Sequence, residues 1–172
     1  MLSIRLSSIA RRMGSFLSSK VRETLILLII FLEPTQKLKD YQVIGLNWLI
    51  RAWHEHRNVV LADEMGLGKT IMTLSLFDHL NKVYKLRGPY LILAPLTTLE
   101  HWKRIADEWT SLNSVLYYDP NSGEGRSEIR HWEWFYTDVT YKGAITQKSE
   151  LYKFNIIITS FEVFMQDLNP IL

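Results

Sequence analysis

The residues with the most specific chemistry lie between Asp63 and Thr70, in the sequence Asp-Glu-Met-Gly-Leu-Gly-Lys-Thr. Gly66 and Gly68 allow the backbone to curl so that several amide N–H groups face one anion. Lys69 can reach the β- and γ-phosphates of a nucleotide, and the Thr70 hydroxyl is suited to ligate Mg²⁺. The spacing therefore predicts a phosphate-binding loop whose ligands are a nucleotide and Mg²⁺.

The elements on either side of this loop fit that chemistry. A short apolar run, Asn58–Ala62, predicts a strand of the kind buried in a parallel sheet. Apolar residues at helical spacing follow the loop: Ile71, Leu74, Phe77 and Leu80. A helix that begins near Lys69 would add the positive end of its dipole. This context disfavours the alternative, a Gly-Leu-Gly-Lys turn that only caps a helix, although a strict Walker A loop has glycine where this chain has Asp63.

Further periodic segments predict the rest of the fold. Residues 40–55 read as an amphipathic helix with Asp40 as its N-cap, and the spacing of Thr97–Glu100 indicates a capping box before a second helix. Other expected elements are strands at 89–95, 114–118 and 154–158, a loop at 119–125 and a helix at 128–136. Strands that alternate with helices predict an α/β fold, a parallel sheet with helices on both faces.

Charge and composition exclude several classes of protein. The 172 residues include no cysteine, so a disulfide scaffold, a cysteine zinc site and a thiol nucleophile are excluded. Residues 1–22 hold five basic and no acidic side chains, whereas the remainder has 15 basic and 18 acidic ones, a net charge of −3. Contact with nucleic acid must therefore come from a local patch.

The N-terminal residues differ in composition from the rest of the chain. Residues 1–20 are rich in serine and arginine, a composition that suits a mitochondrial transit peptide or, alternatively, a disordered basic tail. Thr24–Leu32 is uncharged but too short to span a membrane, which takes about 20 apolar residues. We predict that residues 1–35 form an extension that is not part of the domain beginning at residue 36.

Two other groups of residues give weaker signals. The aromatic residues Trp132, Trp134, Phe135 and Tyr136 suggest base stacking, but packing is the better interpretation because no basic residues are interleaved with them. His54 and His56 face different sides of a predicted helix, and we interpret them as solvated residues.

Several segments together resemble a known family. In order, they are LKDYQVIGLNWL, LADEMGLGKT, LILAPLTTLEHW and IIITSFE. They resemble the first half of the Swi/Snf-type chromatin-remodelling ATPases, a branch of the superfamily-two helicases. RGPYLILAPLTTLEHW and YKFNIIITSFEVF are most similar to the chromodomain-helicase-DNA-binding remodellers. The resemblance covers residues 36–172, accounts for Asp63 in the loop, and implies a RecA-like lobe.

The resemblance also implies roles for individual residues. Gln42 corresponds to the glutamine that reads adenine, and Lys69 and Thr70 to the catalytic pair, with Thr70 on Mg²⁺. The implied nucleotide ligands are Gln42, Asp63, Glu64, Met65, Gly66, Leu67, Gly68, Lys69 and Thr70. The implied contacts to the DNA backbone are Pro95, Leu96, Thr97, Thr98, Thr159 and Ser160. Double-stranded DNA and nucleosomes are the implied partners, ATP and Mg²⁺ the cofactors, and the nucleus the location, with the mitochondrion as the alternative.

The family's Asp-Glu-Ala-His Walker B box and second helicase lobe do not occur in the 172 residues. The sequence is therefore expected to be the ATP-binding portion of an ATP-dependent DNA translocase. The alternatives are a catalytically inactive fragment that binds nucleotide or DNA, and an unrelated P-loop enzyme such as a kinase. We also expect an apolar sheet edge to be exposed beside Ile156–Ile158, because the Walker B strand would lie near it.

Overall fold

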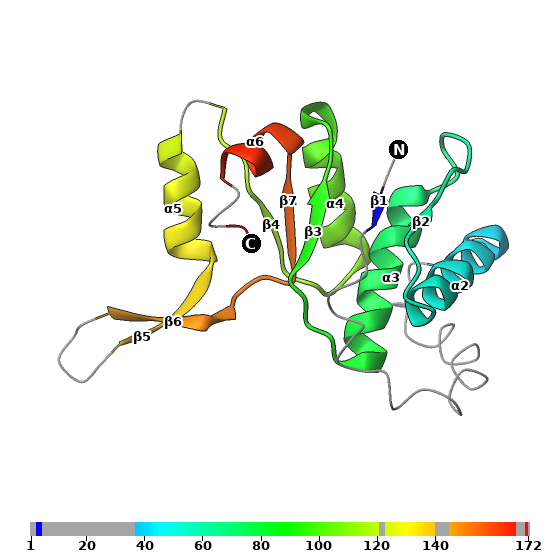
Figure 1. The fold of residues 1–172 in the computed structure, drawn as a ribbon, viewed down its shortest axis with the longest axis horizontal. Coiled ribbons are helices and arrows are strands. Elements are labelled where there is room, and N and C mark those ends of the chain that lie inside the picture. The colour runs from blue at the N-terminus through cyan, green and yellow to red at the C-terminus, as the bar shows by residue number, and fades with distance from the viewer. Residues whose placement is uncertain (1–2, 5–36, 121–122, 140–144, 168–170, 172) are drawn as a thin grey trace. The chain divides into compact units, whose positions relative to one another are not determined.

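A computed structural model describes residues 3–4, 37–120, 123–139, 145–167 and 171 (Figure 1). The chain divides into two compact units, Met1–Lys85 and Leu86–Leu172. The predicted boundary at residues 35 and 36 and the apolar segment Thr24–Leu32 lie outside the described residues. Among the described residues, no helix is long and apolar enough to cross a membrane.

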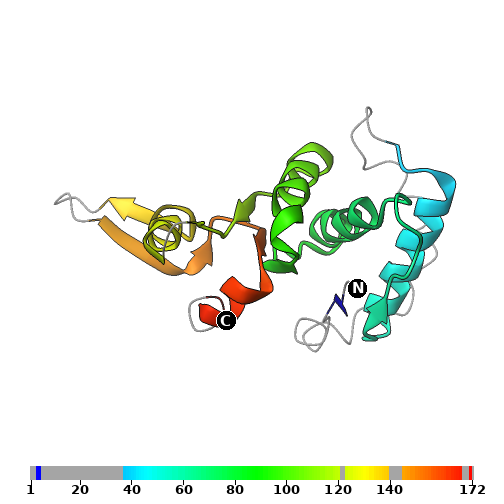
Figure 2. The same ribbon diagram turned by 90° about the horizontal axis from the view of Figure 1, so that it is seen from above.

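The first unit is built on two packed helices. Helix α2 (Asp40–His54) lies against helix α3 (Lys69–Tyr84), as Figures 1 and 2 both show. Gly45 of α2 makes this close approach possible, because a Cβ atom there would lie 2.6 Å from the Met72 sulfur. The buried apolar side chains of the two helices include Leu46, Leu49, Ala52, Trp53, Met72, Leu74, Leu76 and Leu80. The helices predicted from apolar residues at three- and four-residue spacing are thus present in the structure.

Two local predictions for this unit are wrong. The run before the phosphate loop forms only the short strand β2 (Val59–Val60), which pairs antiparallel with β1 (Ser3–Ile4). Apolar, β-branched residues favour a strand but do not determine its partner or direction, which depend on distant residues. At the start of α2, Lys39 is the N-cap and Asp40 is the first helical residue. The Gln42 side chain accepts the Lys39 N–H at 3.0 Å, a bond that a three-residue spacing allows.

The second unit is an α/β sheet unit with an added hairpin. Its parallel sheet has the strand order β3-β7-β4, and two further strands pair antiparallel as β5-β6. The elements are β3 (Tyr90–Leu93), η2 (Leu96–Thr98), α4 (Leu99–Trp109), β4 (Ser114–Leu116), α5 (Gly123–Glu133), β5 (Phe135–Val139), β6 (Ile145–Tyr152), β7 (Ile156–Thr159) and α6 (Phe161–Gln166). The predicted α/β class with a parallel sheet is confirmed.

Strand β7 is the centre of this sheet. It pairs with β3 on one side and with β4 on the other, and its Ile156, Ile157 and Ile158 are all buried. The predicted exposed apolar edge beside these residues is therefore wrong. Crossover connections place a strand that comes late in the sequence between two earlier ones, so chain order does not give spatial order.

The segment after β4 differs from its prediction at both ends. Helix α5 starts at Gly123, inside the predicted loop, and ends at Glu133, so that Phe135 and Tyr136 belong to β5. Trp134 packs edge-on against Tyr117 and Phe154, with ring centroids 5.1 and 5.2 Å apart. The packing interpretation is confirmed for buried Trp134. The aromatic rings and Val163 fill the core where the hairpin meets the sheet.

Candidate functional site

The predicted phosphate loop has the backbone that an anion site needs. Gly66 and Gly68 both have φ of +85°, a left-handed conformation that side chains strongly disfavour. Gly68 is the N-cap of α3, and its carbonyl accepts the Met72 N–H at 3.0 Å. The first turn of α3 carries no acidic residue, so the positive end of the helix dipole faces the loop without a compensating carboxylate from that turn.

The backbone of the phosphate loop orients the Lys69 side chain through two hydrogen bonds. The Lys69 Nζ donates to the carbonyl oxygens of Asp63 at 2.7 Å and Glu64 at 2.8 Å. Both acceptors are uncharged, so these contacts orient the ammonium group without neutralising it. The donor set of amides, helix terminus and ammonium fits the phosphates of a nucleotide.

Thr70 is the one predicted metal ligand, and it lies half-buried in the first turn of α3. The part of the chain that the structure describes contains no group of three or more histidine, cysteine or acidic side chains able to hold a metal ion. A Mg²⁺ ion here would therefore take the Thr70 hydroxyl together with phosphate oxygens, as hard cations prefer oxygen ligands.

Gln42 connects α2 to the phosphate loop. Its side chain is only 6% exposed, and its Nε2 donates to the Leu67 carbonyl at 3.2 Å. The close approach needs Gly68, because a Cβ atom there would lie 2.4 Å from Gln42 Nε2. The structure thus brings together Gln42 and residues 63–70, which the resemblance assigned to one nucleotide.

The first predicted DNA segment, Pro95–Thr98, consists of Pro95 and the turn η2 after β3, and Pro95, Leu96 and Thr97 are exposed. The Thr98 hydroxyl donates to the Pro95 carbonyl at 2.8 Å. The capping box predicted for Thr97–Glu100 is wrong, because the N-cap of α4 is Thr98 and its side chain caps no helical amide. A hydroxyl can bond the preceding turn as readily as a helix amide, and sequence spacing does not distinguish the two.

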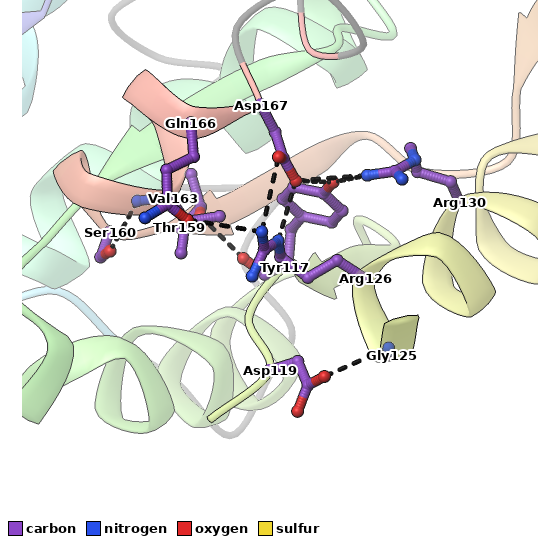
Figure 3. Close-up of polar contacts among 10 residues, drawn as sticks. All are labelled: Tyr117, Asp119, Gly125, Arg126, Arg130, Thr159, Ser160, Val163, Gln166 and Asp167. Carbon is purple, nitrogen blue, oxygen red and sulfur yellow. Dashed lines mark hydrogen bonds and ion pairs between the residues drawn. The ribbon is translucent and has the colours of Figure 1, made fainter. Parts of the chain in front are cut away.

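The second predicted DNA segment, Thr159 and Ser160, directs its hydroxyls into the protein (Figure 3). The Thr159 Oγ1 donates to the Tyr117 carbonyl at 2.7 Å, and Ser160 Oγ accepts the Val163 N–H at 3.3 Å. The two side chains are 0% and 2% exposed. Both predicted DNA segments lie at the carboxyl ends of neighbouring strands, since Leu93 of β3 is the register partner of Thr159 of β7.

An ion-pair network around Asp167 was not predicted. Asp167, which follows α6, accepts from Arg126 Nε at 2.8 Å, Arg130 at 3.2 Å and the Tyr117 hydroxyl at 2.6 Å (Figure 3). The Arg126 guanidinium in particular lowers the pKa of the Asp167 carboxyl. Burial, followed by the bond to Asp167, raises the pKa of Tyr117 to about 12. The sequence signal was only the four-residue spacing of the two arginines, which places them on one helix face.

Half-buried His54 of α2 and buried His79 of α3 both pack edge-on against the Tyr84 ring. The His54 Nε2 and the Tyr84 hydroxyl are 2.8 Å apart, so the prediction that His54 is solvated is wrong. Burial, with a smaller effect of His54, lowers the pKa of His79 to about 4. His56 lies outside the helix and is exposed, with φ of 55°. Helical spacing alone could not show that Tyr84 would cover His54.

A glycine loop that ends in Lys-Thr at the start of a helix, in a chain with an α/β sheet, defines the P-loop class of proteins. Residues 41–171 match the family described as the SNF2-related domain, and the chain belongs to that family. The resemblance seen in the sequence is thereby confirmed.

Individual relatives agree with this assignment. The chain is 41% identical over 133 residues to Chromodomain-helicase-DNA-binding protein 1 of Homo sapiens, across 76% of this chain and 7% of that protein. It is 37% identical over 133 residues to Chromodomain-helicase-DNA-binding protein 6 of Rattus norvegicus, across 77% of this chain and 5% of that protein. The chain thus spans only a small part of these relatives' length.

A solved structure also shares the fold. The Sulfolobus solfataricus SWI2/SNF2 ATPase core in complex with dsDNA matches with a TM-score of 0.58 and 26% identity, over 77% of this chain and 23% of that one. The predicted α/β lobe is confirmed by this likeness.

Proposed function

We propose that this chain is the ATP-binding portion of an ATP-dependent DNA translocase that remodels nucleosomes. The observation that carries the proposal is the phosphate loop, in which two left-handed glycines and an oriented Lys69 converge at the start of α3. Family membership supports ATP as the nucleotide.

Different residues of the site are proposed to bind different parts of the nucleotide. The loop amides and Lys69 would hold the phosphates, and the Thr70 hydroxyl would hold a Mg²⁺ ion, which would supply positive charge to the phosphates. The Gln42 carboxamide keeps one N–H and one lone pair beyond its bonds to Leu67 and Lys39. These two groups suit the exocyclic amine and a ring nitrogen of adenine, so Gln42 both shapes the loop and selects the base.

The proposed DNA contact is the segment Pro95–Thr98, in which Pro95, Leu96 and Thr97 are exposed. Since the hydroxyls of Thr159 and Ser160 are engaged internally, a contact from that segment would use its backbone. A duplex is the supported ligand because the structural neighbour is in complex with dsDNA, and the relatives' names include DNA binding. Nucleosomes are proposed from the resemblance to the chromatin-remodelling ATPases.

Hydrolysis needs a group that positions water, and the Asp-Glu-Ala-His box that would supply it in the resembled family does not occur in the 172 residues. Glu64 is unsuited to this role because it lies within the phosphate loop, where Lys69 binds its backbone carbonyl. These residues alone are therefore proposed to bind ATP without turning it over. For the cellular location we propose the nucleus; a C-terminal fluorescent tag seen in mitochondria would favour the transit interpretation of residues 1–22.

Competition between nucleotides tests the proposal. A fluorescent ATP analogue is bound to the chain with Mg²⁺ and then displaced with ATP or GTP. We expect ATP to displace it at lower concentration than GTP, and Gln42→Ala to remove that preference. An equal preference in the wild-type chain would contradict the role of Gln42, whereas no binding of the analogue would contradict the proposed function itself.

A further inference from the structure

One side of helix α2 exposes large apolar side chains. Tyr41, Ile44 and Trp48 are 41%, 71% and 40% exposed. Their spacing of three and four residues places them together on one side of the helix. Buried residues of α2, such as Leu46 and Trp53, lie on the opposite side. We name the three exposed residues the α2 patch, and a contiguous apolar patch of this kind indicates a surface that another segment or molecule covers.

The α2 patch lies in the first half of the helix and is bordered by charged side chains. Beyond Trp48, the same side carries Arg51 and Glu55, which form an exposed ion pair at 3.4 Å. Before the patch, the Lys39 ammonium lies 5.9 Å from the centre of the Tyr41 ring. At a rise of about 1.5 Å per residue the patch is roughly 10 Å long. It therefore lies at the end of α2 that continues into the preceding residues of the chain.

The residues that precede α2 include an apolar run, Thr24–Leu32, which lies outside the described residues. It has eight large apolar side chains and no charge. Burying one leucine or isoleucine side chain contributes about 1.5–3 kcal/mol, so the run gains much from a cover. Nine residues are too few to span a membrane, which takes about 20. A protein surface is therefore the expected cover.

The apolar run is close in sequence to the α2 patch. Eight residues, Glu33–Asp40, separate Leu32 from Tyr41. Extended, they span at most about 26–29 Å, more than twice the length of the patch. A segment tethered by so short a connection has an effective concentration in the millimolar range, which a second copy of the chain reaches only in a concentrated solution. The chain's own run is thus favoured over a second copy as the occupant of the patch.

We propose that Thr24–Leu32 packs against the α2 patch of the same chain. Uncharged side chains then cover an uncharged surface, while Arg51 and Glu55 stay in solvent beside it. The residues that we predict to be an extension would in this way complete the outer side of α2. The inference is independent of the proposed function, because the match to the SNF2-related domain begins at residue 41, after the run.

Disulfide cross-linking tests the inference, and the chain suits it because its sequence includes no cysteine. Leu28→Cys is combined with Ile44→Cys in the 172-residue chain and oxidised mildly. We expect a disulfide within one chain, seen on a non-reducing gel and located by mass spectrometry of the linked peptides. Leu28→Cys with Trp132→Cys is the matched control, since Trp132 of α5 is 64% exposed. The control pair should react at least about 10-fold more slowly, because a docked run has a high effective concentration only at the patch.

Three outcomes of the cross-linking would overturn the inference. Equal rates for the two pairs would mean that the run is a loose tether. A disulfide between two chains, seen as a dimer on the gel, would mean that a second copy covers the patch. No disulfide in the first pair would mean that the run packs elsewhere. Thermal melts followed by circular dichroism check that each variant is folded.

A second measurement needs no cross-link. Ile44→Asp places a charge in the α2 patch and should release the run, so that the fluorescence of the dye ANS, which binds exposed apolar surface, rises. Trp132→Asp is the control and should leave the fluorescence unchanged, since Trp132 lies on α5. Unchanged ANS fluorescence in Ile44→Asp would overturn the inference.

Discussion

The side chain of Gln42 donates a 3.2 Å hydrogen bond to the carbonyl of Leu67, 25 residues further along the chain. This bond joins the first turn of α2 to the phosphate loop. Gly68, the residue after Leu67, has a left-handed backbone conformation and no room for a side chain. The shape of the loop therefore depends on α2 as well as on its own glycines.

Gly68→Ala should destabilise the chain more than Gly66→Ala. Both glycines have φ of +85°, so each substitution carries a conformational cost of about 1–2 kcal/mol. Only at Gly68 would the new methyl group also meet Gln42, whereas nothing lies within 4 Å at Gly66. Chemical denaturation of both variants measures the difference, and equal losses would show that the contact with Gln42 is not tight.

His79 should make the chain less stable in acid. Its pKa of about 4 in the folded protein lies below the ordinary value of 6.5, so the unfolded chain binds more protons between these pH values. The free energy of unfolding should therefore fall as pH drops from 6.5 to 4, by on the order of 3 kcal/mol in total. Above pH 6.5 the residue has no effect on the pH dependence.

Denaturation curves across this pH range, for the wild type and His79→Leu, check this expectation. The variant should show a shallower pH dependence, while His101→Leu, which removes an exposed histidine of α4, should keep the wild-type slope. A wild-type slope in His79→Leu would assign the acid sensitivity to other groups.

Asp167→Asn should destabilise the second unit by about 1–3 kcal/mol, because hydrogen bonds to charged groups contribute about that much. The carboxylate is bound by Arg126 and Arg130, and the side chains of Asp167 and Arg126 are largely buried. Glu55→Gln is the control, since its pairs with Arg51 and Arg57 are exposed and contribute little. Urea unfolding compares the two variants, and equal stability would show that the network is dispensable.

Residues 1–172 should release no phosphate from ATP, with or without duplex DNA. An arginine that neutralises the γ-phosphate is worth on the order of 10³–10⁵ in rate where GTPases have been measured, and the sequence includes no second lobe to supply one. A phosphate-release assay gives the measurement. DNA-stimulated release that Lys69→Ala abolishes would show that the catalytic residues have been misjudged.

Local pattern explains which parts of the fold were predictable. Helices α2, α3 and α4 follow from three- and four-residue spacing, and β3 and β7 from apolar runs. The antiparallel partner of β2 and the central place of β7 were not predictable, because strand pairing is decided by residues far apart in sequence.

In the candidate site, too, contacts between residues close in sequence were predictable and contacts between distant residues were not. The phosphate loop was predictable because its chemistry is contained within eight consecutive residues, 63–70. The place of Gln42 beside it came from the family resemblance and not from spacing. The bond between Arg126 and Asp167 joins residues 41 apart, and nothing in the local sequence of either residue indicates the other.

Titration with a fluorescent ATP analogue in the presence of Mg²⁺ tests the nucleotide site most directly. The wild-type chain and Lys69→Ala are compared, with Arg51→Ala as a control that removes an exposed positive charge from α2. We predict that Lys69→Ala weakens binding at least about 10-fold, since a hydrogen-bonded charge contributes roughly 1.5–3 kcal/mol, and that Arg51→Ala binds like the wild type. Equal affinity of the wild type and Lys69→Ala would contradict the assignment of residues 63–70 as the phosphate loop.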